Sequence, residues 1–146
     1  MNLIDYRNLP DENFFIVGPC VIENYDILSK VAEVLCILNV KFKKQFIFKA
    51  SIDKANRTSI SSFRGKTLDE GLKLLDKIMS EFDLPITTDV HESYQAEAVG
   101  QVFDSIQIPA FLCRQTDLFV SSAKTGKIVN IKKAQFLSVT SSPNTG

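Results

Sequence analysis

The chain has 146 residues, 45% of them hydrophobic, and its 17 basic and 17 acidic residues give a formal net charge of zero. This size suits a single domain with one core, and the balanced charge excludes the strong field that draws proteins to nucleic acid or anionic membranes. The three cysteines lack CxxC spacing and no apolar run approaches the roughly 20 residues of a membrane helix, so we expect a cytoplasmic protein without disulfides.

Five short runs of apolar, β-branched or aromatic residues predict strands. They lie near residues 14–17, 46–50, 85–89, 104–108 and 127–131. The first two runs are almost continuously apolar, which is typical of parallel strands buried on both faces.

Between the runs, apolar residues recur at the spacing of amphipathic helices. The first series is Leu28, Val31, Leu35 and Leu38, and the second is Leu68, Leu72, Leu75, Met79 and Phe82. Thr67 followed by Glu70 matches a capping box at the start of the second helix. Shorter helices are expected after Ser93 and after Thr116. Strands that alternate with helices predict βα units and a parallel sheet.

Polar segments follow or end every predicted strand. They are Gly18-Pro19-Cys20, Lys49 to Ser59, Thr88 to His91, Gln107 to Asp117 and Asn130 to Lys133. In a (β/α)8 TIM barrel the C-terminal ends of the strands share one rim that carries the catalytic groups. A doubly wound sheet would place ligands only near its switch point. Five decorated strand ends therefore favour the α/β barrel.

A complete barrel takes about 250 residues, and the fifth predicted strand is the last one in this chain. We therefore expect residues 1–146 to be the N-terminal portion of a single TIM-barrel domain, truncated after about five βα units. The open edges of such a sheet would be prone to association.

Basic residues are concentrated in these polar segments and in Phe63-Arg64-Gly65, which follows the second of them. They are Lys49, Lys54, Arg57, Arg64, Arg114, Lys132 and Lys133. Guanidinium groups bind phosphate in a bidentate manner and an ammonium acts as a compact point charge. The pattern favours a phosphate pocket, and a solvated run of charge is the alternative.

Three of these segments resemble the 3-deoxy-8-phosphooctulonate synthases. The resemblance runs from about Phe15 to Phe136, with Ile52 where the family usually has an aromatic residue and Thr58 where it usually has serine. It implies an aldol-type condensation of phosphoenolpyruvate with D-arabinose 5-phosphate. The products are 3-deoxy-D-manno-octulosonate 8-phosphate and phosphate, in lipopolysaccharide biosynthesis.

The resemblance also assigns roles to residues. Those expected to bind the substrates are Lys49, Lys54, Asn56, Arg57, Thr58, Gln107, Pro109, Ala110, Arg114 and Lys132. Those expected to act in catalysis are Lys54, Asn56 and Asp89. For Asp89 and His91, a proton relay at the rim and a hydrogen-bonded structural role both remain open, as do an ion pair and a ligand contact for Arg64. In the family, the arginine at Arg114 reaches into a neighbouring subunit, which implies a homo-oligomer, a tetramer.

Cys20 is expected to bind a metal, because the family divides into metal-dependent enzymes with cysteine at this place and metal-independent ones with asparagine. The ion would be zinc, manganese or iron, since the ligand types do not select one. The other ligands belong to the second half of the family's sequence, so His91 is not paired with Cys20. No organic cofactor is expected, nor is a nucleic-acid or membrane partner. Cys113, with no base evident beside it, is expected to be a packed small side chain.

Two rival functions remain. The related heptulosonate-phosphate (DAHP) synthases share Gly-Pro-Cys, but their hallmark is Lys-Pro-Arg-Thr-Ser, whereas this chain has Lys54-Ala55-Asn56-Arg57-Thr58-Ser59. The other rival is an inactive remnant that only binds anions or a partner barrel.

Overall fold

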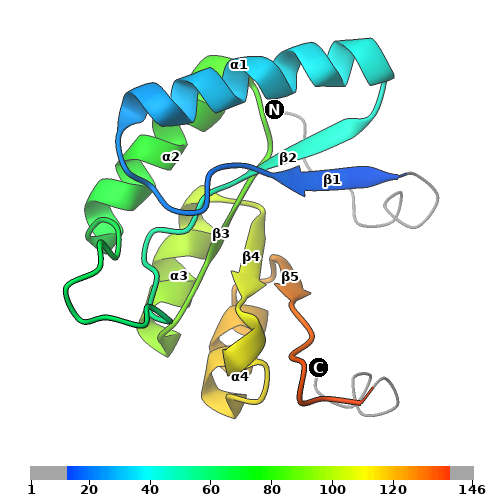
Figure 1. Cartoon of the computed structure of the whole chain (residues 1–146). Coiled ribbons are helices and arrows are strands. Elements are labelled where there is room, and N and C mark those ends of the chain that lie inside the picture. Colours follow the sequence, from blue (N-terminus) through cyan, green and yellow to red (C-terminus); the bar gives the residue numbers. More distant parts are fainter. Residues whose placement is uncertain (1–12, 139–146) are drawn as a thin grey trace.

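The computed structural model describes residues 13–138, which form one parallel sheet with helices between its strands (Figure 1). The five strands lie in chain order, β1-β2-β3-β4-β5, and every neighbouring pair is parallel. They are β1 (Phe14–Val17), β2 (Gln45–Lys49), β3 (Ile86–Asp89), β4 (Ser105–Ile108) and β5 (Ile128–Ile131). All five predicted strands are confirmed, with ends that differ by one residue at most.

Four α-helices connect the strands, and a short 3-10 helix follows β4. They are α1 (Tyr25–Phe42), α2 (Leu68–Phe82), α3 (Ser93–Val102), η1 (Ala110–Leu112) and α4 (Thr116–Lys124). Consecutive helices pack against each other, because right-handed crossovers place them all on one face of the sheet. This is the arrangement of a (β/α)8 barrel as far as its fifth strand.

Side-chain caps fix the starts of the two long helices. The Asn24 side chain accepts a hydrogen bond from the Ile27 amide at the start of α1. Thr67 and Glu70 form the predicted capping box at the start of α2. None of the helices in residues 13–138 is long and apolar enough to span a membrane.

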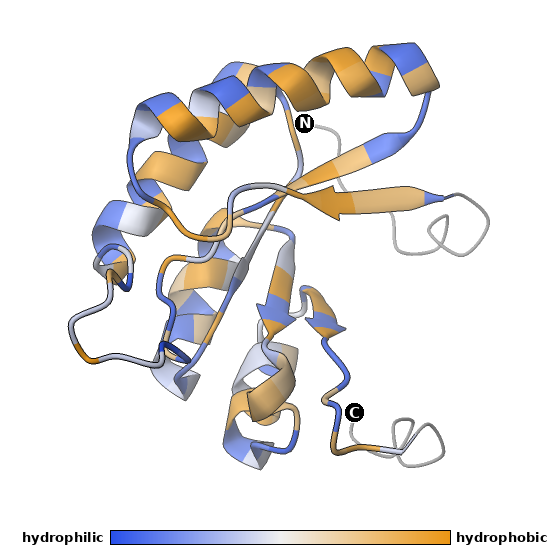
Figure 2. Ribbon diagram, viewed as in Figure 1, coloured by the Kyte–Doolittle hydropathy of each residue, from blue (hydrophilic) through white to orange (hydrophobic). Residues whose placement is uncertain are grey.

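The core lies between the helices and the sheet, where α1 and α2 bury one face each. Phe48 of β2 and Phe103 beyond α3 are its largest fully buried side chains. Figure 2 shows that hydrophobic residues continue onto the outer side of α1 and along β1.

One expectation about burial is wrong. The apolar run at β1 was predicted to be buried on both faces, but Phe14, Phe15 and Val17 are 36%, 45% and 41% exposed. The physical reason is position: β1 pairs only with β2, and its other edge has no strand beside it within residues 13–138. The run at β2 is buried as predicted, since β2 has a neighbour on each side.

Candidate active site at the carboxyl ends of the strands

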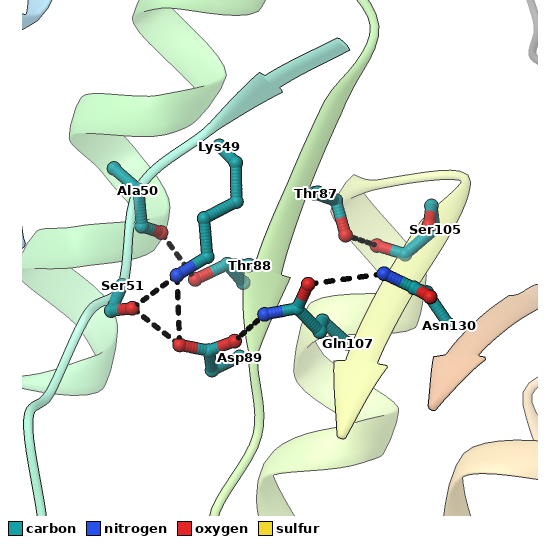
Figure 3. Close-up of polar contacts among 9 residues, drawn as sticks. All are labelled: Lys49, Ala50, Ser51, Thr87, Thr88, Asp89, Ser105, Gln107 and Asn130. Carbon is teal, nitrogen blue, oxygen red and sulfur yellow. Dashed lines mark hydrogen bonds and ion pairs between the residues drawn. The ribbon is translucent and has the colours of Figure 1, made fainter. Parts of the chain in front are cut away.

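Polar side chains from four adjacent strands meet at the C-terminal rim of the sheet (Figure 3). Lys49 ends β2 and Asp89 ends β3, while Gln107 and Asn130 lie in β4 and β5. The strand register pairs Asp89 with Gln107 and Gln107 with Asn130. Cross-strand partners point to the same face of a sheet, so these side chains form one continuous row.

Hydrogen bonds connect the row from end to end. Lys49 Nζ donates to Asp89 Oδ2 at 3.0 Å and to Ser51 Oγ at 2.6 Å. The Ser51 hydroxyl also donates to Asp89 Oδ2, and Gln107 Nε2 donates to Asp89 Oδ1. Asn130 Nδ2 donates to Gln107 Oε1 at 3.0 Å. Asp89 therefore accepts from three donors and is the centre of the network.

The environment shifts the pKa of both charged members. Burial alone would raise the pKa of Asp89, but the Lys49 ammonium and the hydrogen bonds from Ser51 and Gln107 bring it below its ordinary value. Burial lowers the pKa of Lys49, opposed in part by Asp89 and reinforced by Lys54 and Lys132 nearby. Asp89 is therefore ionised at neutral pH and acts as the counter-charge of Lys49.

A cavity of about 410 Å³ opens beside this row. Its size is in the range of small-molecule sites. It brings together eight of the residues predicted to bind substrate or act in catalysis, namely Lys49, Lys54, Asn56, Asp89, Gln107, Pro109, Ala110 and Lys132. Segments distant in sequence thus contribute to one site, as the shared rim of a barrel predicts.

The charge of the cavity is positive. Three lysines line it, Lys49, Lys54 and Lys132, and Asp89 is the only carboxylate among the lining residues. Burial lowers the pKa of His91, which also lines the cavity, so its imidazole is neutral. Asp89 offsets the charge of Lys49 alone, and an excess of two positive charges remains for an anionic ligand.

Comparison with known proteins agrees with this arrangement. The model of the DAHP synthetase I family matches residues 9–144. The chain belongs to this family. It is 61% identical over 122 residues to 2-dehydro-3-deoxyphosphooctonate aldolase of Campylobacter jejuni, a match that covers 84% of this chain and 45% of the relative.

Two further relatives carry the same name, which is a synonym of 3-deoxy-8-phosphooctulonate synthase. The protein of Koribacter versatilis is 56% identical over 124 residues, 85% of this chain and 45% of the relative. An Arabidopsis thaliana protein, 2-dehydro-3-deoxyphosphooctonate aldolase 2, is 54% identical over 134 residues, 92% of this chain and 46% of the relative. This member of the DAHP synthetase I family thus spans about half the length of the curated relatives it matches.

Four of the predicted site residues do not line the cavity of this family member: Arg57, Thr58, Arg114 and Cys20. Arg57 and Thr58 lie in the exposed loop after β2, where Arg57 Nε donates to the Phe63 carbonyl at 3.1 Å. Arg114 is exposed beyond η1. Their roles stay predictions.

Of the two roles left open for Arg64, the structure shows the ion pair. Arg64 Nε donates to Asp53 Oδ1 at 2.9 Å, and its Nη2 contacts Oδ2 of the same carboxylate. The Arg64 guanidinium holds the pKa of Asp53 below its ordinary value. The pair closes the base of the loop that carries Lys54 and Asn56, together with a hydrogen bond from the Lys54 amide to the Arg64 carbonyl at 2.7 Å.

The sequence did not single out several residues that line the cavity: Ala55, Phe111, Leu112 and Gln135. Phe111 and Leu112 reach it because η1 turns the chain back directly after Pro109. A proline after a predicted strand was the available signal for that turn. Gln135 had no chemical signal, since it lies beyond the lysine pair in a segment without regular structure.

The described residues do not form a complete metal site. No group of three or more histidine, cysteine, aspartate or glutamate side chains in residues 13–138 is placed to hold an ion. Cys20 is exposed just beyond β1, next to the bridge between Val21 and Ser51. Cys113 is fully buried and packs with Ala134 and Leu137, as the sequence predicted.

Proposed function

We propose that the complete protein is a 3-deoxy-8-phosphooctulonate synthase that condenses phosphoenolpyruvate with D-arabinose 5-phosphate. The observation that carries this proposal is the cavity with three lysines and one carboxylate at the strand ends. Its excess positive charge suits a phosphorylated carboxylate. The similarity to relatives named 2-dehydro-3-deoxyphosphooctonate aldolase supports the same substrate pair.

In the proposed reaction, C3 of phosphoenolpyruvate attacks the aldehyde carbon of the sugar, and water adds at C2. The resulting phosphorylated hemiketal loses phosphate by cleavage of its C–O bond. Lys49, Gln107 and Lys132 would hold phosphoenolpyruvate, while Lys54 and Asn56 would contact the aldehyde end of the sugar. Holding two anionic reactants in attack geometry against their repulsion can supply about 7–11 kcal/mol.

Turnover tests the proposal directly. We expect a chimera of this chain with the remaining segment of the Campylobacter jejuni relative to release phosphate from phosphoenolpyruvate when arabinose 5-phosphate is present. The control sugar is erythrose 4-phosphate, the substrate expected of a heptulosonate-phosphate synthase. Turnover with erythrose 4-phosphate and none with arabinose 5-phosphate would contradict the assignment.

Arg57 is proposed to hold the sugar phosphate from the exposed loop. Its Nε is engaged by the Phe63 carbonyl, and its terminal nitrogens have no acceptor within residues 13–138. We expect Arg57→Ala to raise the KM for arabinose 5-phosphate in the chimera about tenfold or more, because a charge-assisted bidentate contact is lost. The KM for phosphoenolpyruvate should stay the same. An unchanged KM for the sugar phosphate would count against this role.

Cys20 is proposed as one ligand of a divalent metal whose other ligands lie outside the described residues. We expect the 146-residue chain to bind Zn²⁺ weakly in equilibrium dialysis, and Cys20→Ala to reduce that binding. Cys36→Ala is the matched control, since Cys36 lies partly buried in α1 and donates to the Phe82 carbonyl. Equal Zn²⁺ binding by the wild type and Cys20→Ala would rule this ligand out.

The proposal extends to assembly and location. Arg114 is exposed beside η1, together with Phe111, which is 64% exposed. A homo-oligomer in which Arg114 reaches the sugar-phosphate site of a neighbouring subunit would use this surface. Charged small-molecule substrates suit a cytoplasmic location.

A further inference from the structure

Every hydrogen bond in the polar row points toward Asp89. Lys49 and Ser51 donate to one carboxylate oxygen, Gln107 donates to the other, and Asn130 donates to Gln107 (Figure 3). Within this row, no hydrogen-bond donor faces another donor. The direction of the whole row therefore depends on one buried negative charge.

This direction fixes the orientation of the Gln107 amide. A flip of the amide would place Oε1 against the Asp89 carboxylate and Nε2 against Asn130 Nδ2, so both hydrogen bonds would become repulsive. Nε2 carries two hydrogens, and Asp89 accepts one of them. The other has no acceptor within residues 13–138, and Gln107 lines the cavity. Asp89 thus keeps an N–H, and not a carbonyl oxygen, available to a ligand.

Asp89 restrains Lys49 in the same way. Two of the three ammonium hydrogens are held by Asp89 and Ser51, which leaves one for a ligand in the cavity. Ser51 and Asn130 do not line the cavity themselves. They act through Lys49 and Gln107.

We propose that Asp89 is a positioning residue, which aims Lys49 and the Gln107 amide N–H at an anion in the cavity, and not a base in the reaction. Both of its oxygens are already occupied by donors, and the residue is only 7% exposed. The inference rests on the proposed function only in that the anion is phosphoenolpyruvate.

The affinity of Asp89→Asn for phosphoenolpyruvate distinguishes a positioning role of Asp89 from an effect of its charge alone. The variant removes the one negative charge that lines the cavity, so an effect of charge alone would tighten the binding of an anion. Positioning predicts the opposite. We expect the Kd to rise about tenfold, because Lys49 loses its anchor and Gln107 is free to turn its oxygen to the anion. Asp104→Asn is the matched control: it makes the same change of charge outside the cavity, and its Kd should be unchanged.

A second variant, Asp89→Asn combined with Gln107→Glu, restores the original net charge and a hydrogen-bonded row. The glutamate would accept from the asparagine at 89 and from Asn130, so stability should recover relative to Asp89→Asn. Affinity should not recover, because position 107 then offers no N–H. Full affinity in this double variant would show that the anion needs no N–H from position 107.

Equilibrium dialysis with radiolabelled phosphoenolpyruvate and urea unfolding of the same samples give the two readouts. Weak binding in both variants, with stability regained in the double variant, supports the proposal. Tighter binding by Asp89→Asn, full affinity in the double variant, or no regain of stability would overturn it. A chimera that turned over another sugar would refute the proposed function, while these binding results would stand.

Discussion

Asp89→Asn is expected to lower the free energy of unfolding by about 3–5 kcal/mol, because it leaves the buried Lys49 ammonium without its carboxylate. The two groups lie 3.0 Å apart, and their side chains are only 16% and 6% exposed. The control is again Asp104→Asn. Asp104 pairs with Lys127 at 3.2 Å, but both side chains are 32% exposed, so its loss should change stability by less than about 1 kcal/mol.

The difference between the wild type and Asp89→Asn should depend on pH in a defined direction. The pKa of Asp89 is lowered in the folded state from its ordinary value of 3.8. The stabilisation it supplies is therefore fully present above that value and is lost as the pH falls through the lowered folded pKa. Urea unfolding at neutral pH should show the full difference, and unfolding in strong acid a smaller one. A difference that grows as the pH falls would contradict this assignment.

Gly65→Ala is expected to lower the free energy of unfolding by about 3 kcal/mol. Gly65 has a φ of 130°, and a Cβ built on it would lie 2.0 Å from the Ile52 carbonyl oxygen. The backbone must move, and this part of the chain closes the loop that carries Lys54 and Asn56 through the bridge between Asp53 and Gly65. Urea denaturation measures the loss.

Gly126→Ala separates the steric clash from the effect of positive φ. Gly126 has a φ of 69°, and nothing lies within 4 Å of its added Cβ. Gly126→Ala should therefore lower the free energy of unfolding by only about 1–2 kcal/mol, the cost of a left-handed conformation for an L-residue. Equal losses in the two variants would mean that the contact with Ile52 is relieved without strain.

The order and type of the elements could be predicted because local signals agreed. Apolar runs of strand length alternated with helical spacing, and the Thr67 capping box marked the start of α2. The exposure of β1 could not be predicted in the same way. The apolar sequence of β1 indicates that the strand would be stable in a buried position. Its actual exposure depends on whether another strand lies at its open edge.

The residues of the cavity were predicted better than their interactions. Chemical type and position after a strand were sufficient to select Lys49, Asp89 and Gln107. The hydrogen bonds among them depend on register, which pairs Asp89 with Gln107 across two strands separated by helix α3. Ser51 was not selected, because a serine in a polar loop carries no sign that it will bridge an ammonium and a carboxylate.

The binding of phosphoenolpyruvate to this chain tests most directly whether the cavity with three lysines is its site. Equilibrium dialysis should find one phosphoenolpyruvate bound per chain. In Lys132→Met, which removes a cation from the cavity, the Kd should rise about tenfold or more. Lys127→Met removes the same charge from an ion pair that does not line the cavity, and its binding should match the wild type. Unchanged binding in Lys132→Met, or an equal loss in Lys127→Met, would contradict the assignment of this site.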